Sequence, residues 1–406
     1  MPASKSYTIR GLMCAALAEG ESEVIHPLTS DDTEAALNVL GKIGIGVRQE
    51  RDVWRVKGGD FYQPDTDLFC GESAATLRFM TAVCSLIPGR CRLTSALSLS
   101  KRPIEPLLQA LRQLGINCVR HNEDSSVVVE GGRLKGGTVE LPGDISSQFV
   151  SALLFISPFA EEGVTISLAT PLESKPYVLM TLDCLQSFGI KVEASEDFRR
   201  FEILKQTYKP AKYRVEGDWS SASYLLALGA VCGEVGAENL NPESLQGDKV
   251  LLDFLRDMGA AVEVNKDSVV VRKSGLNAIR ADLSDCIDLL PTMAVLAAVA
   301  DGESEFTGIS RARIKESNRA SALREGLERM GIRVREERDK LAVTGSIPKG
   351  SVIDSKGDHR IAMAFSVLGL ATGETVIDGA ECVSKTYSEF WDVLKSLGGE
   401  VKINEK

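Results

Sequence analysis

Charged and hydroxyl side chains gather just before apolar segments of this sequence, and Lys5, Ser6 and Arg10 form the first such group. The apolar run at residues 12–18 that follows them is typical of a buried helix. Hydroxyl groups at a helix start cap free backbone N–H groups, and the same N–H groups attract anions. Lys5 and Arg10 add two positive charges there. This stretch alone predicts equally a phosphate or carboxylate site and an ordinary capped helix with two surface cations.

Similar groups of residues precede five further apolar segments. If the segments are related by approximate symmetry, their starts converge on one cleft between two domains, where the focused positive field would hold a small anion. The recurrence favours this shared site over separate capped helices. Asp288, Glu316 and His359 lie among these cations and are candidates for proton transfer. The five groups cover residues 71–78 and 101–103, 144–148 and 174–177, 216–221, 285–288 and 311–319, and 356–360 and 384–386.

Six repeated units are expected to position these groups. Leucine followed by a large apolar residue and glycine, as in residues 40–44, recurs about every 70 residues and indicates a helix that ends on glycine. A second, more apolar helix in each unit should lie buried under strands such as residues 117–119 and 126–129. In the last unit only residues 400–403 remain for a strand. The expected buried helices cover residues 12–18, 77–86, 149–155, 224–231, 293–299 and 361–370.

The chain length of 406 residues suits two domains of three units each, at residues 3–216 and 217–406, in an α/β (α+β) fold. A net charge of −10 argues against nucleic acid or an anionic membrane as a partner. No signal peptide or long apolar run is visible, and nine cysteines without a CxxC pair indicate reduced thiols in a cytoplasmic protein. The three histidines lack the spacing of metal ligands, so no metal site is expected.

The ordered motifs of this chain resemble the 5-enolpyruvylshikimate-3-phosphate (EPSP) synthases of the shikimate pathway over essentially the whole sequence. The resemblance implies a two-domain inside-out α/β barrel, in which each domain has three βαβαββ-type repeats around buried helices and the active site lies in the interdomain cleft. The motifs are Ser-Lys-Ser at 4–6 with Arg10, Lys-Arg-Pro at 101–103, Ser-Ser-Gln-Phe at 146–149, Ser-Lys-Pro-Tyr at 174–177, Glu-Gly-Asp-Trp-Ser-Ser-Ala-Ser-Tyr at 216–224, Lys-Glu-Ser-Asn-Arg at 315–319 and Asp-His-Arg at 358–360.

Members of this family transfer the enolpyruvyl group of phosphoenolpyruvate (PEP) to the 5-hydroxyl of shikimate 3-phosphate by addition–elimination, without a metal or organic cofactor. The resemblance therefore implies these two small molecules as partners, and we expect a monomer. It assigns shikimate 3-phosphate to Ser6, Arg10, Ser146, Ser147, Gln148, Ser174, Tyr177, Asp288 and Lys315. It assigns PEP to Lys5, Ala74, Arg102, Gln148, Arg319, Arg360 and Lys385.

The implied reaction takes a proton from the 5-hydroxyl and delivers one to the methylene carbon of PEP. By resemblance, Asp288 and Lys5 are placed at the hydroxyl and Glu316 at the methylene, with His359 close by. Burial would raise the pKa of a carboxylic acid at this site, whereas the surrounding cations would lower it. The sequence leaves this balance open.

The chain departs from the family pattern at residues 72–75, where relatives usually carry Asn-Ala/Ser-Gly-Thr. Ala74 takes the glycine position beside PEP, and its methyl group is expected to crowd the longer inhibitor glyphosate. We therefore expect glyphosate tolerance. Glu72 adds a negative charge near an anion site, so PEP affinity should be affected. Asn318 removes a carboxylate next to Glu316.

Relatives also begin with a strand-bearing segment before the Ser-Lys-Ser motif, and in the family that segment belongs to the second domain. Without it we expect one sheet to lack a strand and to expose an edge. Two explanations are open: residues 400–403 partly cover the gap, or the start of the chain is truncated.

Two alternative functions are weighed against EPSP synthesis. A UDP-N-acetylglucosamine enolpyruvyl transferase would use a nucleophilic cysteine, but Cys91 and Cys118 lie in strand-like apolar segments that indicate packing. A catalytically impaired binding homologue would bind ligand without turnover, yet the chain retains all the candidate acids, bases and anion-binding residues.

Overall fold

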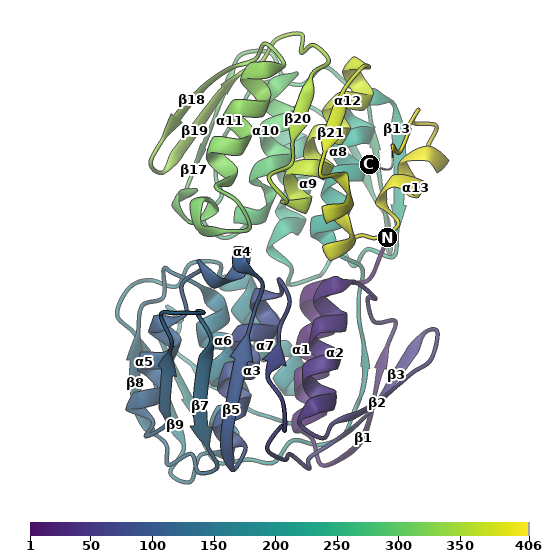
Figure 1. The fold of residues 1–406 in the computed structure, drawn as a ribbon. Helices are drawn as coiled ribbons and strands as arrows, with labels where there is room; N and C mark the ends of the chain where they lie inside the picture. Colours follow the sequence, from purple (N-terminus) through teal and green to yellow (C-terminus); the bar gives the residue numbers. More distant parts are fainter. Residues whose placement is uncertain (405–406) are drawn as a thin grey trace. The chain divides into compact units, whose positions relative to one another are not determined.

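The computed structural model describes residues 1–404, which fold as two compact units (Figure 1). One unit consists of Ala3–Glu216, and the other of Met1–Pro2 together with the chain from Gly217 onward. Each unit has its own hydrophobic core of buried side chains. The chain passes from one unit to the other after Pro2 and returns after Glu216. Within the unit to which it returns, Pro2 O accepts a hydrogen bond from Asp218 N at 2.9 Å.

Six helices are buried along most of their length, and strands lie outside them in each unit (Figure 1). The predicted buried helices are confirmed, although each observed helix begins two to seven residues earlier. The buried helices are α1 (Lys5–Leu17), α3 (Ala74–Val83) and α6 (Ser147–Ile156) in one unit, and α8 (Trp219–Cys232), α10 (Leu290–Ala298) and α12 (His359–Thr372) in the other. The prediction started at a continuous apolar run and left out the first residues of each helix, which are polar in α12 but mostly apolar in α10.

The helices that end at the recurring glycines are also confirmed. Each is followed by a glycine with φ between 81° and 105°, a left-handed conformation that residues with a side chain rarely adopt. These helices are α2 (Asp31–Lys42), α5 (Glu105–Gln113), α7 (Lys175–Ser187), α9 (Leu251–Asp257), α11 (Arg319–Arg329) and α13 (Phe390–Ser396). The shorter helices are α4 (Leu97–Ser100) and the 3-10 helices η1 (Cys84–Leu86), η2 (Ser157–Phe159), η3 (Gly247–Val250), η4 (Ile287–Leu289), η5 (Ser310–Ile314) and η6 (Ala380–Lys385).

The unit at residues 3–216 has three four-stranded sheets, and each contains one parallel pair beside antiparallel strands. This shared pairing pattern supports three related repeats. The first sheet, β12-β1-β3-β2, contains β1 (Gly20–Ile25), β2 (Gly46–Gln49), β3 (Val53–Gly58) and β12 (Lys212–Arg214). The second, β4-β5-β7-β6, contains β4 (Leu68–Phe69), β5 (Gly89–Thr94), β6 (Asn117–Arg120) and β7 (Val127–Gly131). The third, β10-β11-β9-β8, contains β8 (Gly137–Leu141), β9 (Val164–Leu168), β10 (Glu193–Ala194) and β11 (Arg200–Ile203).

The sheets of the other unit differ in size. Only its middle sheet, β16-β17-β19-β18, has four strands among the described residues. It contains β16 (Arg280–Asp282), β17 (Glu303–Thr307), β18 (Arg333–Glu337) and β19 (Lys340–Thr344). The three-stranded sheet β13-β15-β14 contains β13 (Glu234–Glu238), β14 (Ala261–Val264) and β15 (Ser268–Arg272), and a parallel pair contains β20 (Val352–Asp354) and β21 (Val376–Asp378).

The predicted strand at residues 400–403 was wrong. This segment has no strand conformation, and Ile403 is largely exposed. A strand needs hydrogen bonds to a neighbour, and within residues 1–404 neither β20 nor β21 pairs with it. Instead, the beginning of the chain lies beside β13, where the Met1 amino group donates to Glu238 O at 2.8 Å.

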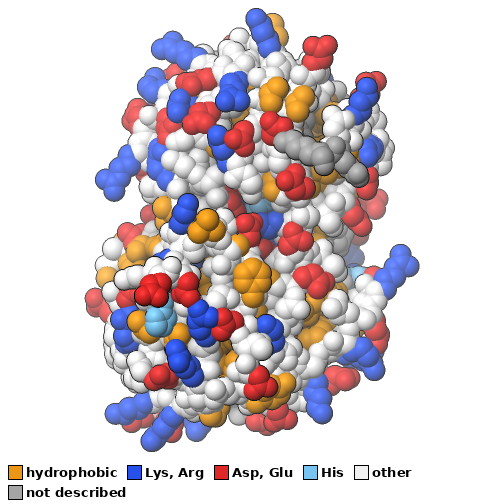
Figure 2. Space-filling model, viewed as in Figure 1, with side chains coloured by type: hydrophobic (Ala, Val, Ile, Leu, Met, Phe, Trp, Pro, Cys, Tyr) orange, Lys and Arg blue, Asp and Glu red, His pale blue; other side chains and the backbone are white. Residues whose placement is uncertain are grey.

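Acidic and basic side chains are interspersed over the visible face of each unit in Figure 2. No helix within the part of the chain that the structure describes is long and apolar enough to cross a membrane.

Glycine is required where β3 crosses the end of α1. A Cβ atom on Gly58 would lie 2.3 Å from Ala15 O and 2.5 Å from Ala16 O. Backbone atoms cannot yield as a flexible side chain can, so Gly58→Ala should lower the free energy of unfolding by about 2–3 kcal/mol, measured by urea denaturation. Gly46→Ala, on the neighbouring strand β2 with no atom within 4 Å of the added Cβ, is the control. Equal losses in the two variants would contradict this account.

Candidate active site

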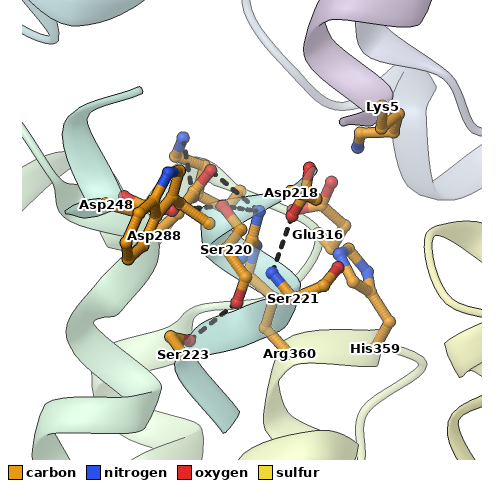
Figure 3. Close-up of polar contacts among 12 residues, drawn as sticks. Lys5, Asp218, Ser220, Ser221, Ser223, Asp248, Asp288, Glu316, His359 and Arg360 are labelled. Carbon is orange, nitrogen blue, oxygen red and sulfur yellow. Dashed lines mark hydrogen bonds and ion pairs between the residues drawn. The ribbon is translucent and has the colours of Figure 1, made fainter. Parts of the chain in front are cut away.

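Asp288 is the centre of a charged cluster in the unit that begins at Gly217. It lies in η4, directly before the buried helix α10. Its Oδ1 accepts a hydrogen bond from Arg319 Nη1 at 2.7 Å and lies 3.3 Å from Lys315 Nζ. Its Oδ2 accepts from Arg360 Nη2 at 3.2 Å (Figure 3). One carboxylate therefore contacts three cations.

These contacts determine the protonation state of Asp288. Burial opposes its negative charge, but Arg360, Lys315 and Arg319 together outweigh burial and hold its pKa well below the usual range. Lys315 shows the opposite effect, since burial lowers its pKa to about 8 even though Asp288 favours the charged form. Near neutral pH the Asp288 carboxylate is ionised, and the Lys315 amine lies close to its titration point.

Arg319 connects the carboxylates of the cluster. It is the first residue of α11 and is 1% exposed. Besides Asp288, its guanidinium donates to Glu316 Oε2 at 2.7 Å and to Asp358 Oδ2 at 2.8 Å. Burial opposes its charge, yet the three carboxylates raise its pKa above the usual value. Arg319 is thus a permanent cation that fixes three acidic side chains.

The remaining predicted residues of this unit adjoin the same cluster. Lys385, the last residue of η6, places Nζ 3.6 Å from Glu316 Oε1. Asp358 caps α12 by accepting from Arg360 N at 3.0 Å, so His359 and Arg360 begin that helix. His359 is 1% exposed. The structure therefore brings together all seven residues predicted in this unit: Asp288, Lys315, Glu316, Arg319, His359, Arg360 and Lys385.

In the unit at residues 3–216, Ser4 caps α1 and places Lys5 and Ser6 in the first turn of this helix. Lys5 Nζ donates to Asp32 Oδ2 on α2 at 2.9 Å. The Asp32 side chain is 5% exposed and that of Lys5 19% exposed. The ion pair fixes the lysine at the helix start.

Arg10 is held one turn further along α1. Its Nε donates to Thr181 Oγ1 at 2.8 Å, and its two terminal nitrogens donate to Ser6 O at 3.0 Å and Tyr177 O at 3.1 Å. The guanidinium also lies over the Tyr177 ring, 5.8 Å from its centroid. Ser174 precedes α7 with φ 54°, a left-handed turn that starts this helix beside Arg10.

A second buried arginine links the start of α6 to the segment after α4. Arg78, on α3, donates through Nη1 to Ser146 Oγ at 3.1 Å and to Gln148 Oε1 at 2.8 Å. Its Nη2 donates to Pro103 O at 2.8 Å, next to Arg102. Ser146 itself caps α6 by accepting from Gln148 N at 3.3 Å. Arg78 thereby positions two of the predicted ligand-binding side chains.

Ala74 is the first residue of α3 and is buried, and Ser73 caps this helix. Glu72 precedes the cap and is exposed, and its Oε1 accepts from Ser98 Oγ on α4 at 2.6 Å. Ser147 is likewise the first residue of α6 and is buried. A serine hydroxyl group therefore caps the start of each of these two helices, as the sequence pattern predicts.

Sequence reasoning missed several residues that hold the site in place. Asp32 and Thr181 contact predicted residues, but isolated acids and hydroxyls are common and gave no signal of their own. Asp358 belongs to the Asp-His-Arg motif, yet the sequence did not indicate its contact with Arg319. Arg78 did give a signal, because it is a charged residue inside the otherwise apolar run of α3. A charge at such a position must be paired, which could have indicated its role.

Comparison with known proteins identifies the family. A family model described as EPSP synthase (3-phosphoshikimate 1-carboxyvinyltransferase) matches residues 1–394. The chain belongs to the EPSP synthase family. A 3-phosphoshikimate 1-carboxyvinyltransferase from Dehalococcoides mccartyi is 52% identical over 99% of this chain and 96% of the relative. One from Methanocaldococcus jannaschii is 40% identical over the same shares of the two chains.

Solved structures agree with this assignment. EPSP synthase from Acinetobacter baumannii has a TM-score of 0.84 at 26% identity, and the match covers 100% of this chain and 96% of that one. The match confirms the expected inside-out α/β fold class of the EPSP synthase family. Family membership makes the chain a transferase of the shikimate pathway.

The cluster around Arg319 yields a stability prediction. Arg319→Gln leaves the carboxylates of Asp288, Glu316 and Asp358 without their common cation, and it should lower the free energy of unfolding by about 3–5 kcal/mol near pH 7. A carboxylate with a lowered pKa, such as Asp288, stabilises the fold above its unfolded pKa and loses that contribution as pH falls. That loss lies below the ordinary aspartate pKa of 3.8, so the deficit of the variant should be smaller at pH 3 than near pH 7.

Arg324→Gln on the same helix is the matched control, because Arg324 forms half-exposed ion pairs with Glu328 and Glu336. The free energy of unfolding of this control variant should fall by less than about 1 kcal/mol. Chemical denaturation at both pH values measures the difference, and similar losses in the two variants would refute the central role given to Arg319.

Proposed function

We propose that the chain transfers the enolpyruvyl group of PEP to the 5-hydroxyl of shikimate 3-phosphate, releasing phosphate by addition–elimination through a tetrahedral intermediate. The observation that carries the proposal is the cluster in which ionised Asp288 contacts three cations while Glu316, a second carboxyl, is held by Arg319 and Lys385. Substrates with a phosphate and a carboxylate need such cations, and the reaction needs one group to accept and one to deliver a proton.

The phosphate of shikimate 3-phosphate would be bound by Ser146, Ser147 and Lys315. The first two stand at the start of α6, where hydroxyl and backbone N–H groups favour a phosphate. Gln148, held by Arg78, would complete this subsite. The remaining proposed ligands of shikimate 3-phosphate, around its ring, are Ser6, Arg10, Ser174, Tyr177 and Asp288.

PEP would be bound by the cations that the sequence motifs assign to it. Arg360 and Lys385 each contact a carboxylate. On binding, each cation would either leave this carboxylate for the anion or contact both. Arg319 already donates to three carboxylates, so PEP would share a nitrogen with one of them. The remaining proposed ligands are Lys5, Ala74, Arg102 and Gln148.

The proton transfers follow from the charges of these groups. Asp288, kept ionised by its neighbours, would accept the hydrogen of the 5-hydroxyl, with Lys5 beside it. Glu316 would deliver the proton to the methylene carbon of PEP, and buried His359 would lie close by. Because the resting pKa of Asp288 is low, it would gain a full proton only as Arg360 or Lys315 turns toward a bound anion.

This assignment is tested by isosteric variants. Glu316→Gln and Asp288→Asn each remove one ionisable carboxyl group and should lower kcat at least about 100-fold, as expected for a general acid or base. Glu325→Gln, on the exposed face of α11, is the control and should retain activity. Steady-state assays of phosphate release measure all three variants. Turnover within tenfold of wild type in either test variant would reject its role.

We also propose glyphosate tolerance through Ala74, since this residue is buried at the start of α3 where PEP is assigned. An added methyl group in a close-fitting site changes affinity by about 10-fold or more. Ala74→Gly should therefore lower the half-inhibitory glyphosate concentration at least about tenfold, whereas Ala75→Gly on the same helix turn should not. Wild-type inhibition at glyphosate concentrations comparable to the KM of PEP would contradict tolerance.

The UDP-N-acetylglucosamine alternative receives no support from the cysteines. Cys91 and Cys118 are buried in β5 and β6, and burial raises the pKa of Cys118 to about 11. A buried thiol with a raised pKa, such as Cys118, is a poor nucleophile. The hydrogen bond with Cys84 lowers the pKa of Cys91, but this thiol is fully buried. We further propose that the enzyme is cytoplasmic, because all nine of its cysteines are free thiols, as is usual in a reducing compartment.

A further inference from the structure

Asp248 is a buried carboxyl group to which neither substrate is assigned. It lies in η3, directly before α9, and is 2% exposed. Its Oδ2 accepts a hydrogen bond from Ser220 Oγ on α8. Among residues 1–404, its Oδ1 has no hydrogen-bond partner. A buried carboxyl group with an unpaired oxygen costs free energy, so a purely structural role explains it poorly.

Ser220 connects Asp248 to Arg360. Arg360 Nη2 donates to Ser220 Oγ at 3.3 Å and to Asp288 Oδ2 at 3.2 Å. Figure 3 shows these four side chains next to one another, although they come from α8, η3, η4 and α12. The guanidinium of Arg360 is therefore held between two carboxyl groups, one in direct contact and one reached through a hydroxyl.

The surroundings of Asp248 disfavour its charge. Burial, followed by the negative charge of Asp288, raises the pKa of Asp248 to about 7. Asp218 at the start of α8 acts in the same direction, whereas Arg360 and the Ser220 hydrogen bond partly oppose the shift. Asp248 consequently changes charge in the pH range in which most enzymes work.

Two neighbouring segments carry further titratable groups. Cys286, just before η4, has its pKa raised by burial and then by Asp248, so it stays protonated near neutral pH. On α9, Asp253 and Arg256 pair with each other at 2.9 Å on the surface.

We propose that Asp248 is a positioning residue that acts through Ser220 on Arg360, setting both the place of the guanidinium and the net charge that it presents to PEP. The proposal rests on the assignment of PEP to Arg360. It adds a pH control to that assignment: protonated Asp248 leaves the positive charge of Arg360 available, whereas ionised Asp248 partly neutralises it.

The sign of the effect follows from this geometry. As pH rises from 6 to 8.5, Asp248 ionises and adds a negative charge beside Arg360, which opposes the binding of anionic PEP. The Asp248→Asn variant would keep the shape of the side chain and its Ser220 contact but stay neutral at every pH. The ratio of variant to wild-type kcat/KM for PEP should therefore rise about 3- to 10-fold over this range.

The matched control is Asp253→Asn, whose carboxylate lies on α9 at the surface. Its ratio to wild type should stay constant with pH, and any titration of PEP or of Lys315 cancels in both ratios. A ratio for Asp248→Asn that stays within twofold between pH 6 and 8.5, or that falls, would overturn the proposal. Absence of phosphate release by the wild type at every pH would instead contradict the proposed function.

Thermal unfolding separates titration from positioning. A carboxyl group whose pKa is higher in the folded than in the unfolded protein makes the fold less stable as pH rises from the unfolded pKa to the folded pKa. Asp248→Asn should therefore unfold at a higher temperature than wild type at pH 8.5, with a smaller gain at pH 5. If this gain is seen while the kcat/KM ratio is flat, Asp248 titrates without acting on Arg360, and the proposal fails.

Ser220→Ala tests the connection itself. Removing the hydroxyl takes away the second anchor of Arg360, so KM for PEP should rise at least about threefold more than kcat falls. A loss confined to kcat would contradict positioning of the PEP anion through Ser220.

Discussion

Three carboxylates, one buried and two largely buried, are tolerated side by side in this protein because one arginine bonds to all of them. Arg319 donates to Asp288, Glu316 and Asp358 at 2.7–2.8 Å, and these residues come from different elements of the same unit. Without that cation, each carboxylate would either be protonated or be expelled toward water. Its presence lets an acidic chain keep three carboxylates, one of which caps α12, within one small volume.

The buried helices determine where such groups can stand. Helices such as α8 and α12 are enclosed by apolar neighbours along most of their length, so their starts are the places where polar side chains gather. Asp218 and Asp358 cap these two helices, and Arg360 follows the second cap. Capping therefore does two tasks: it satisfies the free N–H groups of the helix and orients the residues that would contact an anion.

The repeated units were predictable from the sequence because their signals are local. Apolar runs and terminal glycines predicted the helices, and the positive φ angles of those glycines confirm the reason. The strand expected at residues 400–403 failed because strand formation depends on a partner that a local pattern does not reveal. Most candidate site residues come from motifs at helix starts, and their roles stay predictions.

Residues that support the site were harder to predict. Ser220 and Arg360 are 140 positions apart, and Lys5 and Asp32 are 27 apart, so only the folded chain brings them together. The protonation balance was also beyond sequence reasoning, since it depends on how many cations contact a given carboxylate. For Asp288 three cations outweigh burial, whereas for Asp248 burial prevails.

The central claim is the proposed transfer of an enolpyruvyl group, in which Lys5 and Arg360 are both assigned to PEP. The most direct test is phosphate release from PEP by the purified protein, with and without shikimate 3-phosphate, for wild type, Lys5→Met and Arg360→Met. These variants remove one cation from each unit. The account predicts release that depends strictly on shikimate 3-phosphate and is lost in both variants. Release without shikimate 3-phosphate, or full activity in either variant, would contradict it.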